Sequence, residues 1–311
     1  MLTHLIILLD DTSVSYCHYD VTKTERRLIE LDILKKGIVW GMKENLNIQF
    51  VYPDYELPVE YQAAIDSIDN TKIMPLCHSN SADVLVLKNW EEIVPKDSTC
   101  IIRTCICDLE SHLSTVEKWL SEVSRLNIVL TDIDEFSDEK VDEYSETLDA
   151  ISVFLAEEYK QQHPVQLNLL TDRILLTKMN NCNAGVSNVT LAPDGNFYLC
   201  PAFYYTEQRE CVGNPINGLN IKNLQLLCLD HAPLCRRCDA YHCRRCIWQN
   251  QKLTLDANTP SHQQCVIAHV ERNASRRLMD MIVGKGIRIE NWHKIEEIDY
   301  LDPYNVFNRW K

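Results

Sequence analysis

Short apolar runs recur along the first 175 residues and alternate with segments in which apolar residues return every three or four positions. The runs are mostly continuous, as in parallel strands that are buried on both faces. They predict strands at 4–9, 47–52, 83–87, 99–106, 126–131 and 165–170. The helical spacing predicts helices at 28–45, 58–68, 110–125 and 138–160. Alternating strands and helices indicate an α/β fold with a parallel sheet.

The length of this region limits the architecture. A complete eight-unit barrel takes about 250 residues, so six strand–helix units need roughly 190. The first 175 residues therefore fit an open six-unit (β/α) partial barrel. They also fit a doubly wound sheet, and the pattern alone does not separate the two.

The pattern changes after residue 175, where segments become short, polar and rich in cysteine. VTLAPDGNFYLCP predicts a β-hairpin around Asp194-Gly195, and residues 266–284 predict a helix that stops at a glycine. We therefore expect three consecutive parts: the partial barrel at 1–175, a small cysteine-rich metal-binding domain at 176–275 and a C-terminal tail at 276–311.

Charge and composition exclude several classes of function. The formal net charge of −14 argues against nucleic acid as the main partner, because phosphate binding needs a basic surface. With 8 glycines and neither GxGxxG nor a GxxxxGK[ST] loop, a standard nucleotide-phosphate site is not expected. No apolar run reaches the ~18 residues of a membrane helix. The N-terminus lacks the features of a secretory signal, so we expect a cytoplasmic protein without a membrane partner.

The strongest chemical signal is CRRCDAYHCRRC at 235–246, within a region that holds nine of the 14 cysteines. In a reducing compartment such clusters bind metals more often than they form disulfides. Zinc ribbons separate their C-x2-C pairs by roughly 15–20 residues, so this tight run fits one zinc ion poorly. We expect Cys235, Cys238 and Cys243 at one site and Cys246 at another. The interspersed arginines would offset thiolate charge, or form a solvated face beside structural cysteines.

Seven cysteines follow one another along this region: Cys182, Cys200, the four of the run 235–246 and Cys265. Their order resembles that of the SPASM domain, a C-terminal extension of radical S-adenosylmethionine enzymes that modify peptides. The resemblance implies two auxiliary [4Fe–4S] sites. The first would use Cys182, Cys200 and Cys246, with Cys211 or Cys228 as a possible fourth ligand or with one iron left open. A histidine such as His231, His242, His262 or His269 could also complete this three-cysteine site, because imidazole can replace thiolate in iron–sulfur centres. The second site would use Cys235, Cys238, Cys243 and Cys265.

This resemblance also gives a meaning to the stretch after the first strand. Ser13, Cys17 and Asp20 have the spacing C-x3-C-x2-C, at which the three cysteines of radical S-adenosylmethionine enzymes hold their cluster. Oxygen ligands suit iron–sulfur clusters poorly. The glycine-rich loop that such enzymes carry after the second strand is replaced by FVYPDYELP at 50–58. We therefore expect a degenerate barrel that does not bind S-adenosylmethionine and is not an autonomous radical enzyme.

Nearly the whole chain resembles the CXXX-repeat peptide maturases, companions of a true radical S-adenosylmethionine enzyme in the modification of ribosomal peptides. The resemblance implies an auxiliary protein with one or two [4Fe–4S] clusters that binds a cysteine-repeat precursor peptide, the partner maturase or both. The alternative is an adaptor stabilised by zinc, which has no redox chemistry and would only present the peptide. A third hypothesis is an enzyme that acts through an unrecognised cavity.

Overall fold

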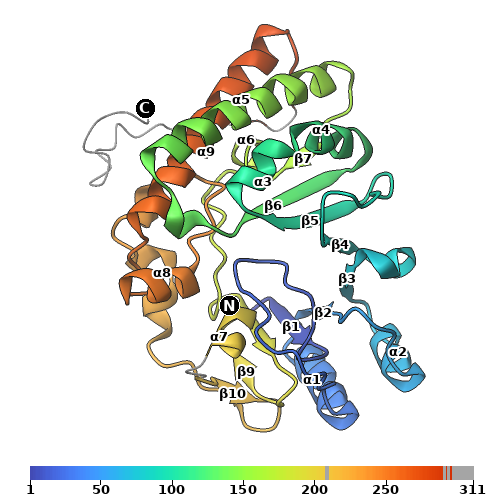
Figure 1. Ribbon diagram of the computed structural model, residues 1–311. Coiled ribbons are helices and arrows are strands. Elements are labelled where there is room, and N and C mark those ends of the chain that lie inside the picture. The colour runs from blue at the N-terminus through green and yellow to red at the C-terminus, as the bar shows by residue number, and fades with distance from the viewer. Residues whose placement is uncertain (207–209, 290–291, 293–294, 296–311) are drawn as a thin grey trace. The chain divides into compact units, whose positions relative to one another are not determined.

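The computed structural model describes residues 1–206, 210–289, 292 and 295 (Figure 1). The chain forms two compact units, each built from two stretches of sequence. Unit 1 comprises residues 1–88 and 183–228, and unit 2 comprises residues 89–182 and 229–311. The tail predicted for 276–311 lies largely outside the described residues beyond 289. The division into three consecutive domains stays a prediction.

Unit 1 is built on a mostly parallel sheet. The strand order is β4-β3-β2-β1-β8-β9, parallel except that β8 and β9 form the expected antiparallel hairpin. The strands are β1 (His4–Leu8), β2 (Asn47–Val51), β3 (Thr71–Pro75), β4 (Val84–Leu87), β8 (Asn188–Leu191) and β9 (Phe197–Tyr198), with a separate pair of β10 (Gly213–Asn214) and β11 (Gly218–Leu219). The helices are α1 (Leu31–Lys43), α2 (Val59–Asp66) and α7 (Pro201–Tyr205), with 3-10 turns η1 (Leu76–Ser81) and η3 (Leu224–Leu227).

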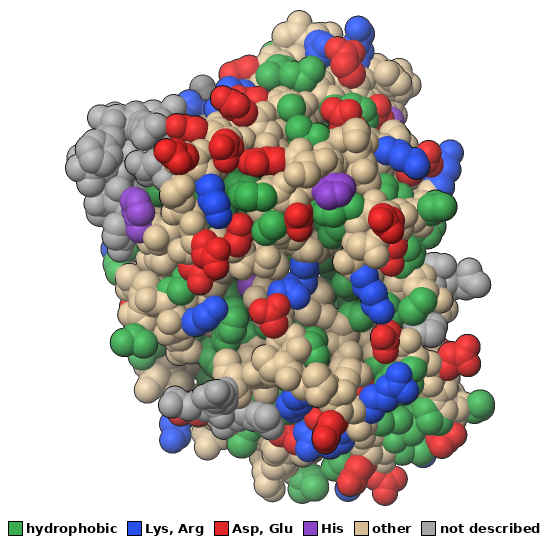
Figure 2. Space-filling view, viewed as in Figure 1, with side chains coloured by type: hydrophobic (Ala, Val, Ile, Leu, Met, Phe, Trp, Pro, Cys, Tyr) green, Lys and Arg blue, Asp and Glu red, His purple; other side chains and the backbone are tan. Residues whose placement is uncertain are grey.

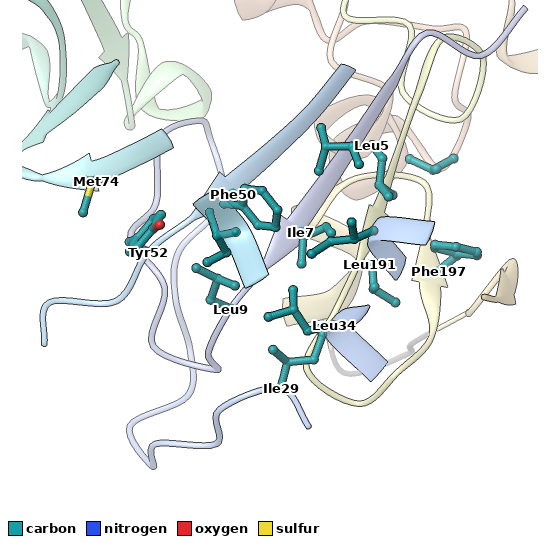
Figure 3. Close-up of a cluster of buried hydrophobic side chains, with 14 residues drawn as sticks. Leu5, Ile7, Leu9, Ile29, Leu34, Phe50, Tyr52, Met74, Leu191 and Phe197 are labelled. Atoms are coloured by element: carbon teal, nitrogen blue, oxygen red, sulfur yellow. The ribbon is translucent and has the colours of Figure 1, made fainter. Parts of the chain in front are cut away.

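The core of unit 1 lies between this sheet and α1 (Figure 3). Leu5, Ile7 and Leu9 alternate along the first strand and its end, and all three are fully buried. Burying each such side chain contributes about 1.5–3 kcal/mol. Gly37 lets α1 approach the sheet, because a Cβ there would lie 2.3 Å from Leu191 Cδ2. A glycine inside a helix costs about 1 kcal/mol relative to alanine, so close packing explains its place here.

Unit 2 pairs a short parallel sheet with long helices. Its strands are β5 (Thr99–Thr104), β6 (Arg125–Leu130) and β7 (Gln166–Leu167), in that order and parallel. Its helices are α3 (Ile106–Ser111), α4 (Leu113–Glu122), α5 (Asp138–Lys160), α6 (Thr171–Leu175), α8 (Ile247–Thr254) and α9 (His262–Gly284), with 3-10 turns η2 (Ile133–Glu135), η4 (Leu229–His231) and η5 (Cys235–Arg237).

The longest helices of unit 2, α5 and α9, lie side by side (Figure 1). The apolar stripe predicted for residues 138–160 is buried as expected, at Val141, Tyr144, Leu148, Ile151 and Leu155. Polar contacts add to this packing: Arg277 of α9 donates to Asp149 of α5 over 2.7 Å, and Lys285 pairs with Glu157. No helix among the described residues is both long and apolar enough to cross a membrane.

Candidate functional site

Two regions carry the chemistry that the sequence singles out, one in each unit. In unit 1 the loop that follows β1 contains the degenerate ligand positions. Ser13 is completely buried; its hydroxyl donates to the Val51 carbonyl over 2.8 Å and accepts from the Asp10 N–H at 2.9 Å. Cys17 is half-buried and Asp20 is exposed. The Ser13 oxygen thus ties the loop to the end of β2.

A cluster of tyrosines and ions surrounds this loop. Asp11, 7% exposed, lies 3.2 Å from Lys23 Nζ and 3.1 Å from Arg27 Nε. The Tyr204 hydroxyl donates to Asp11 and accepts from Arg27, and Lys23 Nζ lies 3.3 Å from the centre of the Tyr204 ring. Burial, followed by hydrogen bonding to Asp11, raises the pKa of Tyr204. The hydroxyl therefore remains a proton donor at neutral pH.

The same cluster continues through stacked rings. Tyr19 and Tyr205 are both buried and stack with ring centres 5.4 Å apart. The Tyr205 hydroxyl donates to the Asp11 carbonyl over 3.3 Å. On the other side of the loop, Tyr55 donates to Asp10 over 2.7 Å. These contacts hold the loop after β1 in one conformation through aromatic packing and paired charges.

Sequence reasoning missed this cluster. Asp11 and Tyr204 lie 193 positions apart, and nothing in the local pattern joins them. The available signal is the aromatic run Phe203-Tyr204-Tyr205, which follows Cys200-Pro201 after one alanine. A run of aromatic residues beside a predicted ligand indicates a packed environment rather than an open loop.

In unit 2 the first part of the run 235–246 folds into tight turns closed by backbone hydrogen bonds. Cys235 lies in η5, and the Cys238 N–H donates to its carbonyl over 3.0 Å. Burial, and then the charge of nearby Cys238, raises the pKa of Cys235 to about 11. Burial likewise raises the pKa of Cys243 to about 12, with Cys235 contributing. Cys235 thus interacts electrostatically with Cys238 and with Cys243, and a metal site shared by the three stays a prediction.

Helix α9 presents further donors to this run. Cys265 lies in its first turn, and His269 follows four residues later on the same face. His269 Nε2 lies 3.7 Å from Cys238 Sγ. His269 therefore lies beside one cysteine of the second predicted site, whereas the histidine expected from the sequence would complete the first site, and that expectation stays a prediction.

Buried charged residues hold the cysteine run in place. Asp239, 4% exposed, lies 2.9 Å from Arg272 Nη1 and 3.7 Å from Arg173 Nη2. His242 Nε2 lies 3.1 Å from Glu271, which accepts from the buried Tyr144 hydroxyl over 2.7 Å. Asp239 and His242 thus fix the loop between Cys238 and Cys243 to α5, α6 and α9.

The arginines of the run divide into two kinds. Arg236, Arg237 and Arg244 are exposed, whereas Arg245 is 3% exposed. Arg245 donates to Asn258 over 2.8 Å, and its charge lowers the pKa of Cys235 and of Cys243 against the larger effect of burial. Only this arginine matches the expected role of offsetting thiolate charge.

The first predicted ligand group is distributed over both units. Cys182 and Cys246 belong to unit 2, and the Cys182 N–H donates to the carbonyl of Arg244 over 2.9 Å. Cys200, Cys211 and Cys228 belong to unit 1. None of the 14 cysteines forms a disulfide. Within the described part of the chain, no three His, Cys, Asp or Glu side chains converge to hold one metal ion. Both ligand groups therefore stay predictions.

The donor chemistry nevertheless fits a thiolate-bound group. Sulfur ligands select zinc and iron–sulfur clusters. Ligand thiols lose their protons when they bind a metal, so metal affinity at these buried thiols would increase with pH. The Cys235, Cys238 and Cys243 set thus has the right chemistry for either group.

Comparisons with solved structures identify the fold. Native anSMEcpe with bound AdoMet and the Cp18Cys peptide aligns with a TM-score of 0.58 and 13% identity, covering 91% of this chain and 100% of that one. Native anSMEcpe with bound AdoMet and the Kp18Cys peptide aligns with a TM-score of 0.58 and 15% identity, covering 90% of this chain and 99% of that one. Hexahistidine-tagged anSMEcpe with bound AdoMet aligns with a TM-score of 0.60 and 12% identity, covering 93% of this chain and 97% of that one. The chain has a radical SAM/SPASM-like fold.

This similarity confirms the predicted fold class, a partial barrel-like α/β fold with a mostly parallel sheet and a cysteine-rich C-terminal region. No protein-family model matches the chain, and no curated protein does either. At 12–15% identity the likeness concerns the fold alone.

Proposed function

We propose that this protein is an auxiliary factor in the maturation of a ribosomally made cysteine-repeat peptide, and that it acts with a true radical S-adenosylmethionine maturase. One observation carries the proposal: a radical SAM/SPASM-like fold in which Ser13 and Asp20 stand where cluster cysteines are expected, and in which Ser13 is bound to the backbone. Radical generation would then belong to the partner, and peptide binding, electron transfer or both to this chain.

The peptide half of the proposal draws support from the solved structures. Two of the similar structures contain both AdoMet and a peptide in a protein of this fold. A companion that keeps this architecture without the cluster ligands would keep a surface for peptide.

The metal half assigns roles to residues of this chain. Cys235, Cys238 and Cys243, completed by Cys265 or His269, would hold one [4Fe–4S] cluster; Cys182, Cys200 and Cys246, with Cys211 or Cys228, would hold the other. Such a cluster supplies one-electron redox chemistry when it is bound. Asp239, Arg245 and His242 would hold the ligand loop in place. Because thiolates also bind zinc, a zinc-stabilised adaptor is the second candidate.

Metal content decides between these candidates. The protein is purified anaerobically, and iron, sulfide and zinc are measured with a visible spectrum. About four or eight irons per chain with matching sulfide support the proposal. Zinc alone makes the protein an adaptor, and a metal-free, colourless protein overturns both. The double variant Cys235→Ser/Cys243→Ser is expected to lose the metal, whereas the exposed Cys107→Ser keeps it.

A maturation assay tests the companion role. The partner maturase and its precursor peptide are incubated with and without this protein, and the modified peptide is measured by mass spectrometry. Faster modification in its presence is expected. A maturase fully active alone contradicts the proposal, and modification by this chain without the maturase makes it an enzyme in its own right.

A further inference from the structure

The outward face of α1 in unit 1 combines lysines with exposed apolar side chains. Lys35, Lys36 and Lys43 are all exposed, and Val39 and Met42 are 48% and 57% exposed. These positions recur at steps of three and four, so they share one face of the helix. That face points away from the core that Leu34, Gly37, Ile38 and Gly41 help to form.

A hollow of about 290 Å³ lies beside this face. It is lined by Lys35, Lys36, Val39, Trp40, Lys43 and Pro215, the last from the turn between β10 and β11. Trp40 packs on Phe197 with ring centres 4.5 Å apart, which fixes one wall. Ligand pockets for drug-sized molecules hold ~300–1,000 Å³, so this hollow suits one bulky side chain of a longer partner.

The charge of the face is opposite to that of the chain. Three lysines lie within nine residues of helix on a protein with a formal net charge of −14. In Figure 2, acidic and basic side chains are interspersed over the visible face of the molecule. No ion pair between described residues uses Lys35, Lys36 or Lys43, although Asp32 and Glu44 flank them in the sequence. A local positive surface on an acidic protein orients an anionic partner.

We propose that this α1 surface, defined by Lys35, Lys36, Val39, Trp40, Lys43 and Pro215, binds an acidic segment of a peptide that places one bulky apolar side chain in the hollow. The lysines contact the carboxylates, and Trp40, Val39 and Pro215 contact the apolar side chain. This inference rests on the proposed function, because the segment belongs to the precursor peptide.

Binding is measured by fluorescence anisotropy with a labelled synthetic peptide of glutamates around a central Leu-Phe pair. Two matched peptides replace the glutamates by lysine or the Leu-Phe pair by Gly-Gly. Lys36→Glu/Lys43→Glu is expected to weaken binding of the first peptide at least about tenfold, and added salt to weaken it further. The control Lys96→Glu/Lys118→Glu makes the same charge change at exposed lysines of unit 2 and is expected to change the Kd less than about twofold.

Several outcomes would overturn the assignment. If both double variants lost the same affinity for the peptide, the effect would come from the net charge of the protein and not from this surface. Equal binding of the lysine peptide, or of the Gly-Gly peptide, would remove the charge or the apolar requirement. Preferential binding of phosphatidylserine vesicles through Lys36 and Lys43 would make the face a membrane surface instead.

The result is separable from that of the proposed function. Lys36 and Lys43 are remote in sequence from the cysteines predicted to bind metal, the first of which is Cys182. The variant Lys36→Glu/Lys43→Glu is therefore expected to keep the metal content of the unchanged protein. If this variant keeps its metal and binds the peptide as well as the unchanged protein does, only the proposed docking surface is contradicted. If the unchanged protein binds the peptide specifically but contains no metal, the α1 surface is supported and the role as a cluster-bearing companion is contradicted.

Discussion

At the scale of single residues, Asp239 connects the cysteine run to two buried arginines. Its carboxylate is buried between Arg272 and Arg173, which are 8% and 5% exposed. The Arg173 Nε–H also donates to the Asp239 carbonyl over 3.1 Å. Because Asp239 directly follows Cys238, these contacts set the path of the ligand loop.

Asp239→Asn is expected to destabilise the protein, since it leaves two buried guanidinium groups without their carboxylate. Removing one partner of a buried ion pair costs about 3–5 kcal/mol. Urea unfolding measures the loss, and metal content is expected to fall with it. Asp230→Asn, an exposed position a few residues upstream, is the control and should leave both unchanged. Full stability in Asp239→Asn would show that the arginines find other partners.

At the scale of elements, α1 depends on the absence of a side chain at Gly37. A Cβ there would lie 2.3 Å from Leu191 Cδ2, within the core of unit 1. Leu191 is itself fully buried between the sheet and the helix, so it has little room to move.

Gly37→Ala is therefore expected to destabilise the protein, although alanine favours helix. Overpacking a core costs about 1–3 kcal/mol, which exceeds the helix-propensity gain of about 1 kcal/mol. Thermal unfolding compares it with Gly284→Ala in α9, where the new Cβ would meet nothing within 4 Å. That control should be neutral or slightly stabilising. A raised Tm in Gly37→Ala would contradict close packing of α1.

Most elements of the fold follow from the hydrophobic pattern, and the exceptions have physical reasons. The predicted strand at 165–170 is reduced to Gln166–Leu167, because the Asn168 side chain pairs with the N–H and carbonyl of Ile128 in place of the backbone ladder. The pattern missed β3, whose sequence TKIMP contains a lysine and a proline. Helix α9 begins at His262, earlier than predicted, because Ser261 and Gln264 form a capping box.

The candidate sites could be predicted only where they are local in sequence. Within CRRCDAYHC, Cys235 interacts electrostatically with Cys238 and with Cys243, while the shared site expected from their spacing stays a prediction. The partners of Asp239 and the tyrosines around Asp11 come from distant segments. Such contacts depend on how elements pack, which short-range periodicity does not encode.

At the scale of the whole molecule, buried tyrosines make both units sensitive to alkaline pH. Burial raises the pKa of Tyr52 in unit 1 and of Tyr159 in unit 2 to about 12, from an ordinary value of 10.0. Tyr19, Tyr204 and Tyr144 are raised by the same cause. In the unfolded chain each would ionise near pH 10, whereas in the folded protein each keeps its proton to higher pH.

Stability should therefore begin to fall near pH 9, the ordinary pKa of the thiols of Cys235 and Cys243, and fall further through the tyrosine range toward pH 12, because over this range only the unfolded state releases these protons. The free energy of unfolding in urea, measured at steps of pH on metal-free protein, checks the decline. Tyr52→Phe keeps the ring and removes one ionisable hydroxyl, whose partner Gln62 is 3.3 Å away. It should make the decline shallower. A free energy of unfolding that stays constant to pH 11 would mean that the buried hydroxyls ionise as readily in the folded protein as in the unfolded chain.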